Sequence, residues 1–304
     1  MTLKIRVPAT SANLGPGFDS LGIAVSSYLT VTVYGKAPKW KVDHKMGYAI
    51  PSDERNMIVA TALKTNPELE PQHIKVTSEI PLAHGLGSSS SALIAGVVMA
   101  NEVGKMHLTN EQILQKAAEL EGHPDNVAPA LYGDFVVSTM VDGDVSSIKL
   151  KFPDLTMVAY IPAYDLATAD ARNVLPAKFP FSEAVAAGSI GNVLVAALVA
   201  GDMKTAGKMI ESDRYHETYR EKLVPHLPIL REIGHRTGAM ATYLSGAGPT
   251  VMSFLPHDRV DEYIALGREA GLNDEYRVLQ IEREGVHVDR SKKNPFIRGI
   301  LFCS

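Results

Sequence analysis

Alternation of apolar and polar side chains predicts strands mainly in the first half of the chain. Residues 2–8 and 23–34 are rich in Val, Ile, Thr and Tyr, and residues 73–80, HIKVTSEI, alternate along their length. Similar runs predict strands at 133–141 and 155–163. Such β-branched, half-apolar runs fit a pleated sheet with one buried face.

Other stretches carry apolar residues at helical spacing. One runs from Ser89 to Val103, and a second follows Thr109, which we expect to cap it, with Gln112 completing a capping box and Gly122 ending the helix. Further helices are predicted at 181–200, 202–212, 226–237 and 258–270, with strands at 250–255 and 276–283. Strands that cluster early and mix with helices later favour an α+β fold over a regular parallel array.

Chain length suggests two domains. The chain has 304 residues, which is longer than a typical domain with a single hydrophobic core. A Pro-Asp turn precedes the strand at 155–163, so we expect one domain at 1–150 and a second at 151–288. Residues 289–304 change from basic to apolar, and we assign this tail no role.

Composition narrows the class of protein. The net charge of −4 gives no reason to expect a nucleic acid partner, and a single cysteine, Cys303, fits a reducing compartment. The first residues lack the apolar stretch of a signal peptide. Residues 184–201 are uncharged and long enough to span a membrane, but glycines, a serine and an asparagine interrupt them, so we expect a buried, tightly packed helix. We therefore expect a cytoplasmic protein without a membrane partner.

A loop rich in glycine and serine, PLAHGLGSSSSAL (81–93), lies between a predicted strand and a predicted helix. The first N–H groups of a helix are unpaired, Gly85 and Gly87 allow close approach of an anion, and serine hydroxyls can donate to phosphate or ligate Mg²⁺. The Walker A pattern is absent, because Ser89 stands where its lysine would be needed, and so is the dinucleotide glycine fingerprint. Taken alone, the loop fits a flexible turn before a capped helix equally well.

Three other stretches concentrate polar or glycine residues. They are PATSANLGPGFDSLGIA (8–24) with Asp19, EGHPDNVAPALYGD (121–134), and YLSGAGPT (243–250). Separately they read as a surface loop, a helix N-cap beside a structural histidine, and a turn.

Together and in this order, the motifs at 8–22, 81–91 and 245–249 resemble those of the GHMP kinase superfamily, nearly to residue 288. The likeness is greatest to its homoserine kinase family, on PATSANLGPGFDSLG, EGHPDNVAPAL, ATADARNVLP (167–176) and YHETYR (215–220). The resemblance implies a domain like ribosomal protein S5 domain 2 followed by a ferredoxin-like domain. It also implies ATP and Mg²⁺, phosphorylation of the side-chain hydroxyl of L-homoserine on the route to threonine, and a homodimer.

The resemblance also implies residue roles. The ATP site would comprise Pro81, Leu82, Ala83, His84, Gly85, Leu86, Gly87, Ser88, Ser89, Ser90 and Ser91, with Asn56 near adenine. Mg²⁺ would be held by Ser89 and Glu121, with Glu119 as the alternative. The substrate carboxylate would meet Arg172, Arg220 and the Gly246 N–H, the ammonium Asp19 and Asp125, and the hydroxyl Asn126, with Asn13 and His123 shaping the pocket. A guanidinium fork suits a carboxylate.

No general base stands out. The resemblance places Asn126 where other members of the superfamily have an aspartate near the acceptor hydroxyl. Asp125 is expected at the ammonium. We therefore expect transfer without a dedicated base, with Asn126, Asp125 and Ser89 as the catalytic residues.

Three other functions remain to be weighed. A GHMP kinase for mevalonate or shikimate would not need the acidic pair Asp19 and Asp125, because those substrates lack an ammonium. A paralogue that only senses a metabolite would not need an intact phosphate loop and metal carboxylate. A nicotinamide dehydrogenase would need the glycine fingerprint that is missing.

Overall fold

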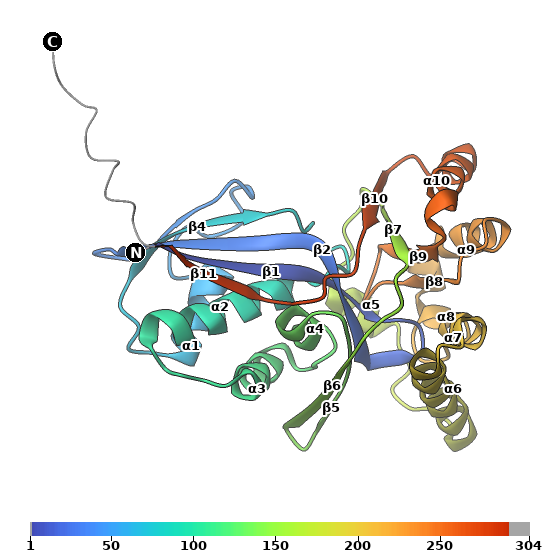
Figure 1. Ribbon diagram of the computed structural model, residues 1–304, viewed down its shortest axis with the longest axis horizontal. Coiled ribbons are helices and arrows are strands. Elements are labelled where there is room, and N and C mark those ends of the chain that lie inside the picture. Colours follow the sequence, from blue (N-terminus) through green and yellow to red (C-terminus); the bar gives the residue numbers. More distant parts are fainter. Residues whose placement is uncertain (1, 292–304) are drawn as a thin grey trace, which may run out of the picture.

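Two antiparallel-rich sheets organise the computed structural model, which describes residues 2–291 without the side chain of Ser291. The first sheet has the order β11-β1-β2-β4-β3, and β5 and β6 continue from another part of β2 (Figure 1). Its strands are β1 (Thr2–Asn13), β2 (Gly17–Lys36), β3 (Lys41–Asp43), β4 (Gln72–Ser78), β5 (Phe135–Val141), β6 (Asp144–Leu150) and β11 (His287–Ser291).

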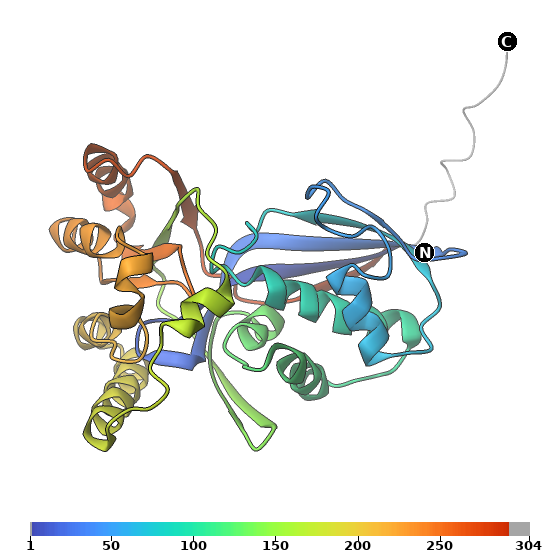
Figure 2. The ribbon, with the colours of Figure 1, turned by 180° about the vertical axis from the view of Figure 1, so that it is seen from behind.

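Four helices cover one face of this sheet. They are α1 (Met57–Thr65), α2 (Ser88–Gly104), α3 (Asn110–Glu121) and α4 (Val127–Tyr132). Figure 2 shows them, light blue to green, in front of the blue strands. The capping box of Thr109 and Gln112 before α3 is present and Gly122 ends the helix, so that prediction is confirmed.

The second sheet has the order β10-β7-β9-β8, and all its pairs are antiparallel. Its strands are β7 (Thr156–Ile161), β8 (Ala241–Leu244), β9 (Val251–Leu255) and β10 (Glu275–Leu279). The accompanying helices are α5 (Thr168–Asn173), α6 (Phe181–Ala200), α7 (Met203–Ile210), α8 (Glu217–Arg220), α9 (Leu227–Arg236) and α10 (Val260–Glu269), with short 3₁₀ segments at Glu221–Leu223 and His257–Arg259. The α+β prediction is confirmed.

The chain passes between the sheets twice. The expected boundary near residue 150 falls between β6 in the first sheet and β7 in the second. At the other end, β11 pairs with β1 from Thr2↔Ser291 to Arg6↔His287. Residues 287–291 thus belong to the first sheet and span the boundary expected at 288. The rest of the expected tail, 292–304, lies outside the described residues.

The stretch 8–24, which alone reads as a surface loop, is instead the buried end of the β1–β2 hairpin. Its residues are small because other backbone lies against them: a Cβ on Gly15 would come within 1.9 Å of the Ile210 carbonyl oxygen. The hairpin therefore reaches from the first sheet to the helices beside the second, where Figure 1 shows its dark blue end near α6 and α7.

Helix α6 is not the tightly buried helix that we expected. It is long and apolar enough to cross a membrane, yet only 22% of its most apolar stretch is buried. Four of its residues are buried, namely Ala187, Leu194, Ala197 and Leu198. Its other faces are open, and Figures 1 and 2 place the helix at the outer edge of the molecule.

Candidate active site

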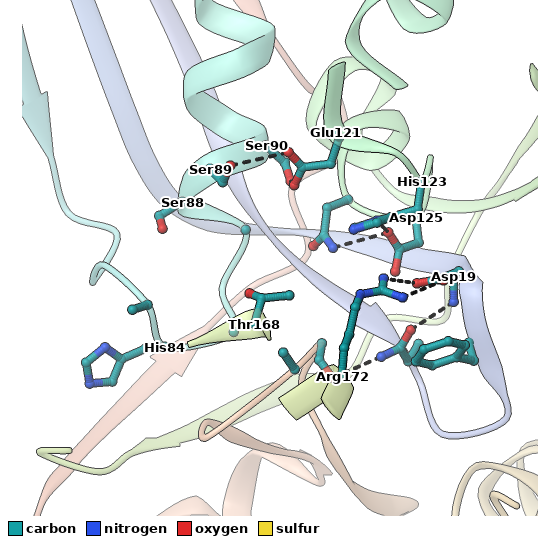
Figure 3. A pocket seen from close by; sticks show the side chains of 18 of the residues that line it. Asp19, His84, Ser88, Ser89, Ser90, Glu121, His123, Asp125, Thr168 and Arg172 are labelled. Atoms are coloured by element: carbon teal, nitrogen blue, oxygen red, sulfur yellow. Dashed lines mark hydrogen bonds and ion pairs between the residues drawn. The ribbon is translucent and has the colours of Figure 1, made fainter. Parts of the chain in front are cut away.

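A cavity lies where the β1–β2 hairpin, the loop before α2, the segment before α4, and helices α5 and α8 meet (Figure 3). Most residues expected in the site line it: Asn13, Asp19, Ala83, His84, Gly85, Gly87, Ser88, Ser89, Ser90, Glu121, His123, Asp125, Asn126, Arg172, Arg220 and Gly246. Motifs that are far apart in sequence therefore contribute to one site.

Five expected residues do not line the cavity: Pro81, Leu82, Leu86, Ser91 and Asn56. Leu86 is fully buried in the core, and the Ser91 hydroxyl donates to the Pro8 and Gly87 carbonyls. Asn56 caps α1: its side-chain oxygen accepts from the Ile58 N–H, and its amide nitrogen donates to the Pro51 carbonyl. The Asn56 side chain thus has a structural role at the start of α1, and its place near adenine stays a prediction.

The loop before α2 requires glycine for a geometric reason. Gly87 occupies the position before the helix with φ of 67°, and a Cβ there would lie 2.0 Å from the Thr10 hydroxyl oxygen. The Ser91 N–H bonds to the Gly87 carbonyl, so the N–H groups of residues 88–90 precede the first helical bond. Such N–H groups, together with the helix dipole, favour an anion at the edge of the cavity.

Contacts with the other half of the molecule hold this loop. The Ser245 hydroxyl donates to the Gly85 carbonyl at 2.6 Å, and the Leu166 N–H donates to the Ala83 carbonyl at 3.3 Å. The His84 ring lies 3.0 Å from the Pro162 carbonyl through Nε2. Both sheets thus contribute to the position of the loop.

Glu121 lies against the first turn of α2. Its carboxylate accepts from Ser90 Oγ at 2.7 Å and from Ser89 Oγ at 3.3 Å, as Figure 3 shows. Glu119 instead accepts from Gln115, away from the cavity. A carboxylate and two hydroxyls beside an anion site are the hard oxygen ligands that Mg²⁺ takes, so Glu121 fits the metal and Glu119 does not.

Asp125 is the buried centre of a second cluster. It accepts from His123 Nδ1 at 2.5 Å and from Asn126 Nδ2 at 3.3 Å. The Thr10 hydroxyl donates to Asn126 Oδ1 at 2.7 Å, which fixes the amide with its nitrogen toward Asp125. Burial alone would lower the pKa of His123, but the hydrogen bond to Asp125 and the negative charges of Asp125, Asp19 and Glu121 raise it overall.

Asp19 and Arg172 form a two-point ion pair at the cavity wall. Arg172 Nη2 donates to Asp19 Oδ1 at 2.6 Å and Nη1 donates to Oδ2 at 3.1 Å. This bond raises the pKa of Arg172 against the effect of burial. Asp19 has φ of 54°, and its N–H donates to Asn13, which itself has φ of 73°. Backbone of this kind is uncommon outside glycine and is typical of functional sites.

Arg220 is a buried guanidinium without a carboxylate partner among the described ion pairs. It donates to the carbonyls of Ala171 and Gly246 and to His216 Nδ1, at 2.9 to 3.0 Å. Burial, followed by the charge of Arg172, lowers its pKa to about 10. The cavity therefore contains a cation whose charge lacks a direct counter-ion, the condition that favours an anionic ligand.

The role expected for Gly246 needs correction. Its N–H donates to the Ala12 carbonyl, so it is not available to a substrate. Its carbonyl instead accepts from Asn13 Nδ2 and Arg220, and so orients both side chains.

Four further residues, which the sequence did not single out, support the side chains of the site. Thr10 and Phe18 lie inside the first motif, and Phe18 has its ring centroid 5.3 Å from the Arg172 guanidinium and 5.6 Å from that of Arg220. Thr168 lines the cavity from α5. His216 donates through Nε2 to the Gly15 carbonyl, and its position one turn before Arg220 was the available signal.

Comparisons with known proteins give matches in both halves of the chain. Residues 56–134 match the family model of the GHMP kinases N terminal domain, and residues 194–270 match that of the GHMP kinases C terminal. The chain is 50% identical over 287 residues to a homoserine kinase of Streptococcus gordonii, covering 94% of this chain and all of that one.

Two solved structures extend the likeness to three dimensions. A protein assigned as a homoserine kinase from Listeria monocytogenes superposes with a TM-score of 0.85 at 42% identity, over 95% of this chain and all of that one. A homoserine kinase from Cytophaga hutchinsonii superposes with a TM-score of 0.82 at 28% identity, over 95% and 97% of the two chains.

Proposed function

The chain belongs to the homoserine kinase family of the GHMP kinases, and from that premise we propose how its cavity transfers phosphate from ATP to the side-chain hydroxyl of L-homoserine. The reaction yields O-phospho-L-homoserine, an intermediate on the route to threonine. One observation carries the assignment: the Asp19 carboxylate and the guanidinium groups of Arg172 and Arg220 line the same cavity as the N-terminus of α2.

When homoserine binds, its charged groups replace the internal contact between Asp19 and Arg172. In the described structure Asp19 and Arg172 neutralise each other. The substrate carries one ammonium and one carboxylate, so it can insert between them, with the ammonium on Asp19 and the carboxylate on Arg172. The net charge of the pocket stays constant, which limits the desolvation cost of binding.

Arg220 supplies the second cation for the carboxylate. Its three bonds to neutral acceptors fix the guanidinium while leaving its charge uncompensated. Phe18 lies against both arginines and excludes water on that side. Asp125 accepts the remaining ammonium hydrogens, and His123 and Asn13 fix the shape of the pocket.

The N–H groups of residues 88–90 would bind the ATP phosphates at the start of α2. Ser89 and Glu121 would hold Mg²⁺, with Ser90 as a further hydroxyl, and the ion when bound neutralises phosphate charge. Phosphoryl transfer needs mainly positioning and charge neutralisation, which these groups provide.

The transfer proceeds without a dedicated base. Asn126 faces the cavity but cannot take up a proton usefully, and its amide nitrogen is available to orient the substrate hydroxyl. Asp125 is already engaged by His123 and Asn126 and is held for the ammonium. The proton leaves with the transferred phosphate group.

We place the enzyme in the cytoplasm as a homodimer. A single cysteine in 304 residues supports a reducing compartment. The open apolar face of α6 supports association between copies.

A coupled ADP-release assay with ATP and Mg²⁺ tests the substrate. The panel contains L-homoserine, L-threonine, L-serine, mevalonate and shikimate. We expect turnover with homoserine well above the others, because it alone has the charges and the hydroxyl reach that the pocket suits. Faster turnover with mevalonate or shikimate would contradict the zwitterion pocket. ATP binding without any turnover would point to a metabolite sensor instead.

A further inference from the structure

The His216 ring lies fully buried between the tip of the β1–β2 hairpin and the guanidinium group of Arg220. Its Nε2 lies 3.0 Å from the Gly15 carbonyl oxygen, and its Nδ1 lies 3.0 Å from Arg220 Nη1. The Arg220 N–H donates to the His216 carbonyl, so the first turn of α8 places both side chains on one face. One imidazole thus contacts two elements that line the cavity, although His216 itself does not line it.

The two partners of the ring fix its tautomer. A guanidinium group has no acceptor, so Nδ1 carries no hydrogen and accepts from Arg220. A carbonyl oxygen cannot donate, so the ring hydrogen lies on Nε2, toward Gly15. The Asp213 carboxylate lies 3.8 Å from Nε2 and already accepts the backbone N–H groups of residues 215–217. His216 is therefore neutral in this arrangement.

These bonds hold the Arg220 guanidinium along one edge. Nε donates to the Ala171 carbonyl at 2.9 Å. Nη1 donates to the Gly246 carbonyl and to His216 Nδ1, each at 3.0 Å. Nη2 donates to no residue within the described range 2–291. Because Arg220 lines the cavity, the two Nη2 hydrogens are the ones left for a ligand.

We propose that His216 is a positioning residue for the substrate carboxylate and acts through Arg220. Its unprotonated Nδ1 takes one Nη1 hydrogen and so keeps Nη2 directed at the ligand. The inference deepens the proposed function and rests on it, because there Arg220 binds the carboxylate of homoserine.

The same ring links the two charged ends of the pocket. The Gly15 carbonyl belongs to the hairpin that carries Asp19, which would bind the ammonium. Phe18, on that hairpin, has its ring centroid 5.5 Å from that of His216, so the imidazole is enclosed on this side. The ammonium and carboxylate of an α-amino acid are attached to one carbon, so binding both requires a constant distance between the hairpin and Arg220. His216 maintains that distance by bonding to both.

Two substitutions separate the two bonds of the ring. The Asn side-chain oxygen reaches about the position of Nδ1, and the Gln side-chain nitrogen reaches about the position of Nε2. His216→Asn therefore keeps an acceptor for Arg220, whereas His216→Gln keeps the donor to Gly15 and loses that acceptor. In the ADP-release assay, His216→Gln should raise KM for L-homoserine about tenfold with kcat within about threefold. His216→Asn should keep KM within about threefold of the wild type.

A second substrate distinguishes positioning of the carboxylate from general damage. 3-Aminopropan-1-ol has the ammonium and the hydroxyl of homoserine but no carboxylate. Its kcat/KM should therefore agree within about twofold between the wild type and His216→Gln.

His226→Gln is the matched control variant. His226 is also buried, and its Nε2 donates to the Pro249 carbonyl at 2.9 Å. It does not line the cavity, and none of its described hydrogen bonds involves an arginine. His226→Gln should therefore keep the wild-type KM for homoserine.

NMR of the full chain labelled with ¹⁵N on its histidine rings tests the tautomer without turnover. The His216 signals are identified by their absence from His216→Asn. At neutral pH we expect a hydrogen on Nε2 and none on Nδ1. A hydrogen on Nδ1 would overturn the proposal even if His216→Gln fails to fold.

Three kinetic results would also overturn the proposal. They are an unchanged KM for homoserine in His216→Gln, an equal loss of kcat/KM with 3-aminopropan-1-ol, and a tenfold rise of KM in His216→Asn. A wild type that does not phosphorylate homoserine would contradict the proposed function and, with it, this role of His216. Wild-type turnover with an unchanged KM in His216→Gln would contradict the role of His216 alone.

Discussion

At the scale of single residues, oppositely charged side chains of the site pair with one another. Asp19 is held by Arg172, and Asp125 by His123, so four of the cavity's ionisable groups lie in pairs. Arg220 and Glu121 take part in none of the described ion pairs, and the pKa of Arg220 is lowered to about 10 by burial and by Arg172. A zwitterionic substrate can replace the Asp19–Arg172 contact and bring an anion to Arg220 at the same time.

The absence of a general base predicts different effects at two adjacent residues. Asn126→Ala removes one neutral hydrogen bond to the substrate hydroxyl, so kcat should fall about tenfold with a similar KM. Asp125→Asn removes a charged partner of the ammonium, so kcat/KM should fall about 100-fold through both constants. Steady-state kinetics measure both. A basic limb of the pH–rate profile that disappears only in Asp125→Asn would identify Asp125 as a base and contradict the mechanism.

His226 predicts a pH dependence of stability. It is buried beside Tyr160 and donates to the Pro249 carbonyl at 2.9 Å, and burial lowers its pKa below 6.5. As pH falls through about 6.5, the unfolded chain takes up a proton before the folded chain does, so the free energy of unfolding falls. His226→Gln keeps a donor for Pro249 and should lose less Tm than the wild type between about pH 7 and 5. An equal loss in both proteins would contradict this assignment.

At the scale of elements, the phosphate loop depends on how closely its neighbours approach. Gly87 is confined by Thr10 from β1 and by Asn126 before α4, and Gly85 by the Ser245 carbonyl before β9. The loop therefore takes its shape from three separate segments as well as from its own glycines.

Two glycine variants separate backbone strain from this confinement. Gly87 and Gly143 both have positive φ, at 67° and 87°, but a Cβ on Gly143 meets nothing within 4 Å. Gly143→Ala should lose about 1 kcal/mol of stability through its positive φ alone, and Gly87→Ala should lose more, because its Cβ would also collide with the Thr10 hydroxyl. Gly87→Ala should in addition lose about 100-fold in turnover, because the loop must move away from Thr10. Thermal unfolding and the ADP-release assay measure the two effects, and equal turnover in both variants would contradict the confinement.

At the scale of the whole molecule, local patterns predicted the elements better than their partners. The strand at 73–80, the capped helix after Thr109 and the glycine turn before α2 were predictable, because their signals are local. The pairing of β11 with β1 was not, since nothing local in residues 287–291 indicates a return to the first sheet. The exposure of α6 was missed for a similar reason: apolar composition alone does not tell whether a helix is covered by its own chain or by another.

In the candidate site too, local motifs were predictable and long-range contacts were not. Motif order located its polar residues, and most of them line one cavity. Their mutual bonds were not predictable: Asp19 with Arg172, Thr10 with Asn126, and the carbonyl rather than the N–H of Gly246 with Arg220. Such contacts join residues more than 25 positions apart, and so they depend on the tertiary fold and not on local pattern.

The central claim is that the Asp19–Arg172 pair opens to admit a zwitterion. The most direct test compares kcat/KM for L-homoserine and for 4-hydroxybutanoate, which lacks the ammonium, in the wild type and in Asp19→Asn. We predict a preference of about 100-fold or more for homoserine in the wild type, and a preference reduced to about tenfold or less in the variant. An unchanged preference in Asp19→Asn, or equal use of both compounds by the wild type, would contradict the account.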